Sequence, residues 1–261
     1  EKNPQTGFSI LLAAWNNGDA KVLERIAECY RYGQGVEGSI QLAEKFYRLA
    51  AENDFLNNFS LGEFLLGLDN IEKRNEGISI LSKLSDKCFL AGVALIGDFL
   101  NSESDIDGRT LFQWLLNYQR TDGIVPYLLA KFYLTGRGIE QNLEKGFEYL
   151  KKAYSIDGSG YFLLAECYRN GIGCKANNNE AIKIYRDILK GGDPIAKRGL
   201  GVLLLEDEEK SEEGLHLITE AAESGVPEAI RDLVEIYKDG NPELALRWLK
   251  KLAFTNDAET N

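Results

Sequence analysis

The chain has 261 residues, of which 44% are hydrophobic and 27% are charged, so it can build a sizeable core. Its formal net charge of −11 argues against nucleic-acid binding and against simple docking onto anionic lipid, because both need a basic face. The sequence has no continuous apolar run of about 18 residues, so it predicts no membrane-spanning helix.

A pattern of apolar residues that is typical of a helix opens the chain and recurs along it; we interpret it as the second helix of each repeat. In this pattern a small residue is followed three and four places later by large apolar residues, as Gly7 is by Ile10 and Leu11. This is the spacing of one helix face. Later copies centre on Ala43, Gly77, Gly146, Ala181, Gly214 and Ala245. The third repeat is the weakest copy, because Thr110 takes the small position, although Trp114 keeps the aromatic one.

Another pattern alternates with the first one and predicts a partner helix for each copy. It reads apolar, small, variable, apolar, and aromatic or leucine, and its small positions are 33 to 36 residues apart. Such a period predicts pairs of antiparallel helices that stack through one continuous core. The small residues are expected where paired helices approach most closely: Ala27, Gly62, Gly97, Ala130, Ala165 and Gly201.

Paired glycines follow the first helix in three repeats, as Gly33-Gln34-Gly35, Gly136-Arg137-Gly138 and Gly171-Ile172-Gly173. With Leu-Ala/Gly-x-x-Tyr before the glycines and Ala-x-x-φ-Tyr after them, the chain resembles the Sel-one-like repeat family, a branch of the tetratricopeptide superfamily. The resemblance runs from Gly7 to about Ala253. The other repeats lack the paired glycines, so family expectations for this loop apply to three copies only.

The predicted fold is all-α, a right-handed α-solenoid of about seven antiparallel helix pairs. Residues 1–19 form an N-terminal half-repeat with only the second helix, and residues 20–256 form the seven repeats. Residues 257–261 are expected to be a frayed tail. The repeats are predicted to behave as one cooperative unit.

The resemblance implies a binding scaffold, since family members typically act as adaptors and assembly platforms. Bacterial members include envelope proteins and, in some toxin systems, immunity proteins. We therefore expect a non-enzymatic, soluble protein–protein interaction scaffold or adaptor, with an immunity or inhibitor role as one form of it. The alternative is an enzyme or a small-ligand receptor with a pocket in the groove.

Motifs for chemistry are missing from the sequence. The paired glycines match neither phosphate-binding pattern and are interpreted as positive-φ helix stops. His216 is the single histidine and is expected on the surface, and no Cys-x-x-Cys occurs. We therefore predict no catalytic residue, no metal and no cofactor.

The four cysteines are expected to be buried, reduced thiols, because the repeat arrangement gives no pair a bridging geometry. Free thiols favour a reducing compartment, whereas a chain that starts without methionine allows a removed export signal. A cytoplasmic and a periplasmic location both stay open.

A stripe of charged residues follows the small positions of the first helices. In the tetratricopeptide arrangement these residues point into the concave groove; five of the seven here are acidic: Glu28, Glu63, Asp98, Lys131, Glu166, Val202 and Glu235. One turn earlier on the same faces lie Phe59, Tyr127 and Phe162. An acidic groove with aromatic anchors would suit a partner protein with a basic or amphipathic segment.

A solvated face is the competing interpretation of this stripe. Glu28, Glu166 and Glu235 are each followed three residues later by a cation, at Arg31, Arg169 and Lys238, and such pairs only stabilise a helix slightly. Glu63 and Asp98 lack that neighbour and are the strongest candidates. The predicted partner-binding set is Glu28, Phe59, Glu63, Asp98, Tyr127, Lys131, Phe162, Glu166 and Arg169.

Overall fold

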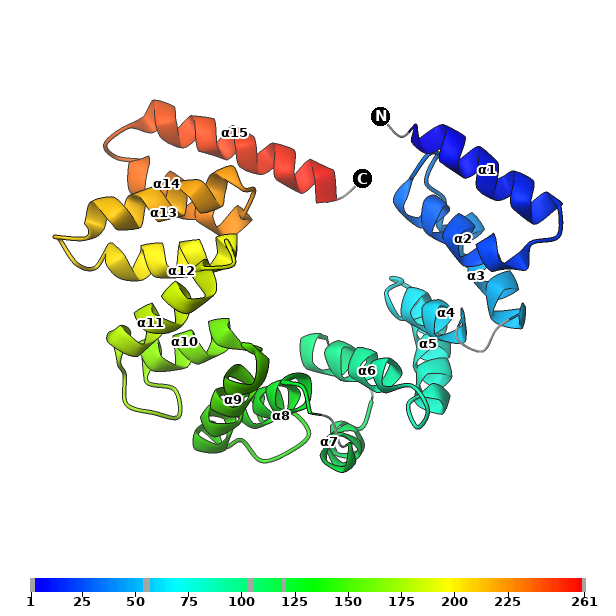
Figure 1. The fold of residues 1–261 in the computed structure, drawn as a ribbon, viewed down its shortest axis with the longest axis horizontal. Coiled ribbons are helices and arrows are strands. Elements are labelled where there is room, and N and C mark those ends of the chain that lie inside the picture. Colours follow the sequence, from blue (N-terminus) through cyan, green and yellow to red (C-terminus); the bar gives the residue numbers. More distant parts are fainter. Residues whose placement is uncertain (1–2, 54–56, 103–105, 119–120, 260–261) are drawn as a thin grey trace. The chain divides into compact units, whose positions relative to one another are not determined.

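A computed structural model of the chain describes all residues except 1–2, 54–56, 103–105, 119–120 and 260–261. In this described part the chain forms fifteen α-helices and one short 3-10 helix, and it contains no strand (Figure 1). The all-α prediction is therefore confirmed.

The helices carry the two sequence patterns in alternation, and α1 carries the pattern centred on Gly7; the division into a half-repeat and seven repeats stays a prediction. The last helix reaches Glu259, while residues 260–261 of the predicted tail lie outside the described residues. The bounds are α1 Pro4–Asn16, η1 Ala20–Val22, α2 Leu23–Tyr32, α3 Ile40–Asn53, α4 Asn57–Leu66, α5 Ile71–Leu84, α6 Phe89–Asn101, α7 Gly108–Asn117, α8 Ile124–Thr135, α9 Leu143–Asp157, α10 Tyr161–Asn170, α11 Asn178–Leu189, α12 Pro194–Leu204, α13 Ser211–Glu223, α14 Pro227–Tyr237 and α15 Pro242–Glu259.

The chain divides into two compact units, which we call the first unit, Glu1–Leu111, and the second unit, Phe112–Thr260. In the first unit, α1 to α4 share a core that includes Ile26 and Phe64. In the second unit, one core centres on α9 to α12 and another on α13 and α14. Helix α7 begins in the first unit and ends in the second. That the repeats unfold as one cooperative unit stays a prediction.

Glycine at the small positions lets paired helices touch through their backbones. In the first unit, a Cβ built on Gly77 of α5 would lie 2.7 Å from the carbonyl oxygen of Gly62 on α4. In the second unit, Gly201 and Gly214 make the same approach. Gly97 does not follow the prediction, since a Cβ there would meet no described atom of the first unit within 4 Å. Its second helix is the one in which Thr110 replaces the small residue.

Paired glycines have two separate roles. The first of each pair ends a helix with a left-handed backbone, at φ values of 64° for Gly33, 67° for Gly136 and 69° for Gly171, which confirms the predicted helix stop. In two of the pairs the second glycine, Gly35 or Gly173, brings the loop against the start of the preceding second helix. A Cβ on Gly173 would lie 2.1 Å from the carbonyl oxygen of Leu143 at the start of α9.

All four cysteines are free, as predicted. Cys29 and Cys167 are buried, while Cys88 and Cys174 are partly exposed. Helix α10 ends at Asn170 instead of continuing to Cys174, and the Cys174 thiol donates a hydrogen bond of 3.4 Å to the carbonyl oxygen of Cys167. The two residues are therefore closer than a continuous helix would place them.

Ion pairs join neighbouring repeats at the surface. In the first unit, Arg48 of α3 contacts Glu44 one turn earlier and reaches Glu76 of α5 with two hydrogen bonds of 2.7 and 2.8 Å. In the second unit, Arg198 of α12 binds Asp232 of α14 through two hydrogen bonds of 2.6 and 3.2 Å. These bidentate pairs fix the register between successive helix pairs.

Candidate partner-binding site

One pocket in the second unit brings together three of the predicted partner-binding residues. Tyr127 and Lys131 of α8 and Phe162 of α10 line a cavity of about 520 Å³. All three are half-buried. The remaining lining residues come from the start of α10 and of α12: Gly160, Tyr161, Leu163 and Ile195. The sequence pattern therefore identified residues that share a pocket across two successive first helices.

Gly160 gives the pocket its shape. Its φ of 75° lies in the left-handed region, and a Cβ there would lie 2.8 Å from Cδ2 of Tyr127 and 3.0 Å from Cδ2 of Leu150. A larger residue would thus be strained and would also push the Tyr127 ring aside. The missing side chain leaves room for that ring against the loop.

Asp193, which caps α12, holds the side of the pocket that Tyr161 and Ile195 form. One carboxylate oxygen, Oδ1, accepts hydrogen bonds from the backbone N–H groups of Ile195 at 2.7 Å and Ala196 at 3.2 Å. The other oxygen accepts a 2.7 Å hydrogen bond from the Tyr161 hydroxyl. Burial, together with this hydrogen bond, raises the pKa of Tyr161. The same carboxylate therefore fixes two lining residues, Tyr161 and Ile195, before any partner arrives.

Lys131 provides the positive charge of the pocket. Its Nζ lies 6.0 Å from the centroid of the Tyr127 ring, at the outer limit of a cation–π contact. Burial lowers the pKa of Lys131 and raises that of Tyr127. Among the described residues, no carboxylate forms an ion pair with Lys131. An apolar surface with one cation of this kind can bind a side chain that is largely apolar and carries or adjoins an anionic group.

Glu166 and Arg169 lie one and two turns beyond Phe162 on α10. Glu166 has an oxygen 3.9 Å from the Arg169 guanidinium, and it accepts hydrogen bonds from Asn170 at 3.2 Å and from the Tyr185 hydroxyl at 3.5 Å. Arg169 also binds Glu206 at 3.2 Å, just after the end of α12. The local pairing that the competing interpretation predicted is therefore present at this position, and Glu166 is only partly available to a partner.

Glu28 differs from its predicted pairing. Its carboxylate forms an ion pair with Arg25, on the N-terminal side, and not with Arg31. The Arg31 guanidinium instead lies over the rings of Tyr32 and Phe64, at 5.1 and 5.6 Å from their centroids. The spacing along the helix allows Glu28 to pair with Arg25 or with Arg31. Arg31 lies against aromatic rings instead, so Glu28 pairs with Arg25.

Phe59 and Glu63 share one face of α4, as the spacing predicted. Phe59 is half-buried and Glu63 is exposed. Among the described residues, Glu63 forms no ion pair or side-chain hydrogen bond. Its carboxylate is thus the most accessible of the acidic residues in the predicted set.

Asp98 is neutralised from another helix. The Arg74 guanidinium of α5 binds its Oδ1 at 2.6 Å, and only 9% of the Asp98 side chain is exposed. Asp98 was ranked highly because no cation follows it on its own helix. That reasoning is wrong for Asp98, since spacing along one helix says nothing about a cation from its neighbour.

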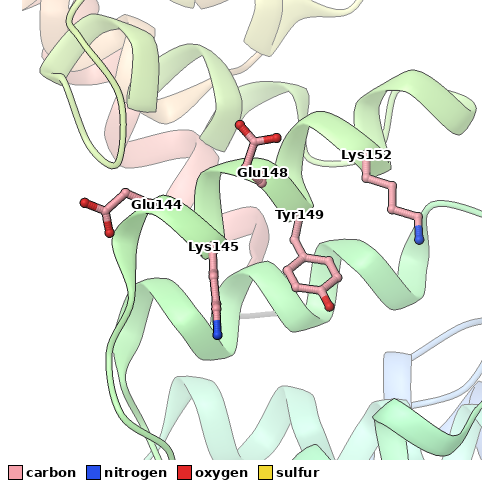
Figure 2. A pocket seen from close by; sticks show the side chains of 5 residues that line it. All are labelled: Glu144, Lys145, Glu148, Tyr149 and Lys152. Atoms are coloured by element: carbon pink, nitrogen blue, oxygen red, sulfur yellow. The ribbon is translucent and has the colours of Figure 1, made fainter.

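A second hollow of about 310 Å³ lies along α9 (Figure 2). Lys145 and Tyr149 point to one side of the helix and Glu148 to the other. Tyr149 stacks on Tyr133 of α8, with centroids 5.6 Å apart and planes 10° apart, and the Lys145 ammonium lies 5.5 Å from the centroid of the same Tyr133 ring. This surface belongs to a second helix, whereas the predicted partner-binding residues all lie on first helices.

Signals for chemistry or membrane insertion are weak in the described part of the chain. No group of three His, Cys, Asp or Glu side chains there could hold a metal ion, and no helix there is long and apolar enough to cross a membrane. His216 is on the surface as predicted, with 71% of its side chain exposed, and it lies 3.8 Å from Glu220.

Sequence reasoning missed Gly160, Tyr161, Leu163 and Ile195 in the pocket. The available signal for Gly160 was the glycine pair Gly158-Ser159-Gly160 between two predicted helices. For Ile195 the sequence shows only an isoleucine after Pro194 at the start of a predicted helix; in the structure 47% of it is accessible. Neither signal could be placed beside α8 without knowing how successive repeats pack.

A family model for the Sel1 repeat matches four segments of the chain, residues 20–55, 127–156, 158–186 and 236–253. Three of these segments include the repeats that carry paired glycines. None of the curated proteins matches the sequence.

Two solved structures share the fold of the chain. A Sel1 repeat protein from Oxalobacter formigenes is 21% identical with a TM-score of 0.63, and the match covers 95% of this chain and 76% of that protein. A protective antigen of uropathogenic Escherichia coli, described as displaying an SLR fold, is 20% identical with a TM-score of 0.55. That match covers 95% of this chain and 56% of the antigen, so the chain spans little more than half of its length. At this identity the two structures establish the helical-repeat fold alone.

Proposed function

Since the chain is a Sel1 repeat protein, and such repeats generally mediate protein–protein interactions, we propose that it is a non-enzymatic scaffold that holds a partner protein. The partner binds the face of the first helices in the second unit. Its anchor point is the pocket of Tyr127, Lys131 and Phe162. The observation that carries this proposal is that one preformed pocket contains these three residues of the predicted stripe.

The pocket has the composition of an interface centre. Energetically dominant interface residues are concentrated in aromatic and cationic side chains that line well-packed pockets. Here two tyrosines, one phenylalanine and one lysine surround the cavity, and Ile195 extends it with accessible apolar surface. Because Gly160 and Asp193 fix the walls, a partner side chain would enter without ordering the pocket first.

Within the second unit, Glu166 and Arg169 continue the α10 face beyond Phe162, where a charged part of the partner segment would lie. In the first unit, considered by itself, Phe59 and the exposed Glu63 lie on one face of α4, and Glu28 follows the small residue of α2 in the same way. That face would favour a segment with apolar and basic side chains. Asp98 is left out of this proposal, because Arg74 already neutralises it.

Adaptor and inhibitor are two forms of the same activity. As an adaptor the chain would hold its partner without changing it, whereas as an immunity or inhibitor protein it would block an effector's action. Measuring the activity of the bound partner, once captured, separates the two.

A small-ligand receptor is the second candidate. The cavity of about 520 Å³ falls in the range of about 300–1,000 Å³ that is usual for small-molecule sites. A small molecule that co-purifies from native cells with the wild-type chain, but not with Phe162→Ala, would favour this role over partner binding.

Affinity capture of partner proteins from the native cell, with the chain as bait and quantified recovery, tests the proposed scaffold function. We would compare the wild-type chain with Tyr127→Ala, and with Tyr149→Ala as the control for an equally aromatic residue of the same unit on α9. A partner that is retained by the wild type and the control but lost from Tyr127→Ala supports the proposal. Equal recovery on all three proteins contradicts it.

A further inference from the structure

Lys131 is a charged group in apolar surroundings, with no ion pair among the described residues. The residue is half-buried, and its neighbours in the pocket are aromatic or aliphatic apart from the glycine backbone and the tyrosine hydroxyls. Among the described residues no carboxylate pairs with it, and burial is the cause that lowers its pKa. Asp193, which holds the lining residues Tyr161 and Ile195, is already engaged by hydrogen bonds from the Tyr161 hydroxyl and from backbone N–H groups of α12.

Partly buried ammonium groups are normally paired, because removing the charge from water costs free energy that only an ion pair or hydrogen bonds offset. Two other half-buried lysines of the second unit follow this rule. Lys197 pairs with Glu220 at 3.1 Å, and Lys251 donates a hydrogen bond of 3.1 Å to the carbonyl oxygen of Glu223. Lys131 differs from them, because among the described residues no acidic or carbonyl partner is recorded for its ammonium, and a partner molecule could supply the anion.

We propose that the pocket receives an aromatic or large aliphatic side chain of a partner segment together with an adjacent acidic side chain, whose carboxylate binds the Lys131 ammonium. This inference rests on the proposed function, and it specifies the chemistry of the partner at this point. The apolar side chain occupies the space between Tyr127, Phe162 and Ile195, and the carboxylate replaces the water that Lys131 loses.

The adjacent repeat places an opposite charge at the same register. Lys131 and Glu166 each follow the small residue of their helix, on α8 and α10 respectively. A segment lying across both helices would therefore meet a cation and then a carboxylate. A wholly basic segment would place a cation against Lys131, which the apolar surroundings make costly. The pocket thus selects the amphipathic form of partner over the basic one.

Blocked tetrapeptides test this charge preference with the intact chain. N-acetylated and C-amidated Gly-Phe-Glu-Gly, Gly-Phe-Gln-Gly and Gly-Phe-Lys-Gly differ only in one side chain and have no terminal charges. We would titrate each into the full chain and measure affinity from backbone NMR shifts. We expect the glutamate peptide to bind about fivefold or more tightly than the glutamine peptide, with the lysine peptide the weakest, because a charge-assisted hydrogen bond forms only with glutamate.

Two variants decide whether Lys131 causes the preference. Lys131→Met should remove the difference between the glutamate and glutamine peptides, and Lys131→Glu should make the lysine peptide the tightest. Lys145→Met is the matched control, because Lys145 also lies over a tyrosine ring but on α9. It should leave the preference unchanged. If no peptide binds, if all three bind within twofold, or if the preference survives Lys131→Met, the inference is wrong.

Failure of this inference can be separated from failure of the proposed function. If Tyr127→Ala abolishes partner capture while the peptides show no charge preference, the pocket binds the partner but not through a carboxylate. If Tyr127→Ala leaves capture unchanged, the proposed site itself fails.

Discussion

Gly201 of α12 and Gly214 of α13 touch through their backbones: a Cβ on either would lie 2.7 Å from the carbonyl oxygen of the other. No side chain fits between these helices without moving them apart. Gly62 and Gly77 show a similar approach in the first unit, where a Cβ on Gly77 would lie 2.7 Å from the Gly62 carbonyl oxygen. The small positions of the repeat therefore set the distance between the helices of a pair.

Gly214→Ala should lower the free energy of unfolding by about 1–3 kcal/mol, because the added methyl group overpacks this backbone contact. Gly97→Ala is the control. Gly97 lies within α6, and no described atom of the first unit would meet a Cβ there within 4 Å. The substitution should therefore raise the free energy of unfolding by about 0.5–1 kcal/mol, because alanine reduces the backbone freedom of the unfolded chain. Denaturant titrations measure both changes. Equal destabilisation by the two substitutions would show that space between the helices is not the cause.

Acid should weaken the link between α3 and α5. Hydrogen bonding by Arg48 lowers the pKa of Glu76, and at Glu44 the bonds from Lys73 and Arg48 outweigh burial and also lower the pKa. Both carboxylates therefore stabilise the fold above the unfolded-state pKa of about 4.5, and this contribution is lost as the pH falls through their folded-state values.

Glu76→Gln should consequently give a shallower loss of stability below about pH 4.5 than the wild type. At pH 7 it should cost only about 0.5 kcal/mol, because the pair is well exposed. Thermal unfolding at pH 3 to 7 measures this, with Glu63→Gln as the control at an exposed carboxylate without an ion pair among the described residues. The prediction fails if the two variants show the same pH dependence.

Much of the fold followed from spacing, because each small position and its apolar neighbours lie within one helix. The glycine helix stops, the shared face of Tyr127 and Lys131 on α8, and the shared face of Phe162 and Glu166 on α10 are all properties of this kind. Contacts between repeats could not be predicted in the same way. Arg74 reaches Asp98 from another helix, and Gly160 makes room for the Tyr127 ring from another repeat. Such contacts depend on how helix pairs stack.

Thiol reactivity should separate the buried cysteines from the others. Burial raises the pKa of Cys167 to about 11 and also raises that of Cys29, so both are protonated at pH 8. In native buffer Cys29 and Cys167 should react with a thiol reagent much more slowly than Cys88, and four thiols should react in denaturant without reductant. Two or fewer in denaturant would reveal a disulfide, with Cys167 and Cys174 as the first pair to examine.

Lys131→Met should not destabilise the chain and should raise the free energy of unfolding by about 0.5–2 kcal/mol, the usual gain when a functional residue is replaced by one that suits the fold. The reason is that the folded state holds the Lys131 ammonium in apolar surroundings without an anion among the described residues. Because the pKa of Lys131 is lowered on folding, the gain should shrink as the pH rises towards the unfolded-state value of 10.5. A loss of stability would instead assign Lys131 a structural role.

Photo-crosslinking from the pocket is the most direct test of partner binding at this site. A benzophenone amino acid would replace Phe162 in the pocket or, separately, Tyr149 on α9, and native cells would be irradiated. The account predicts a discrete crosslinked partner from position 162 and none from position 149, and it predicts that Tyr127→Ala removes the crosslink from position 162. A partner that crosslinks from position 149 but not from position 162 would contradict the assignment of the site to the face of α8, α10 and α12.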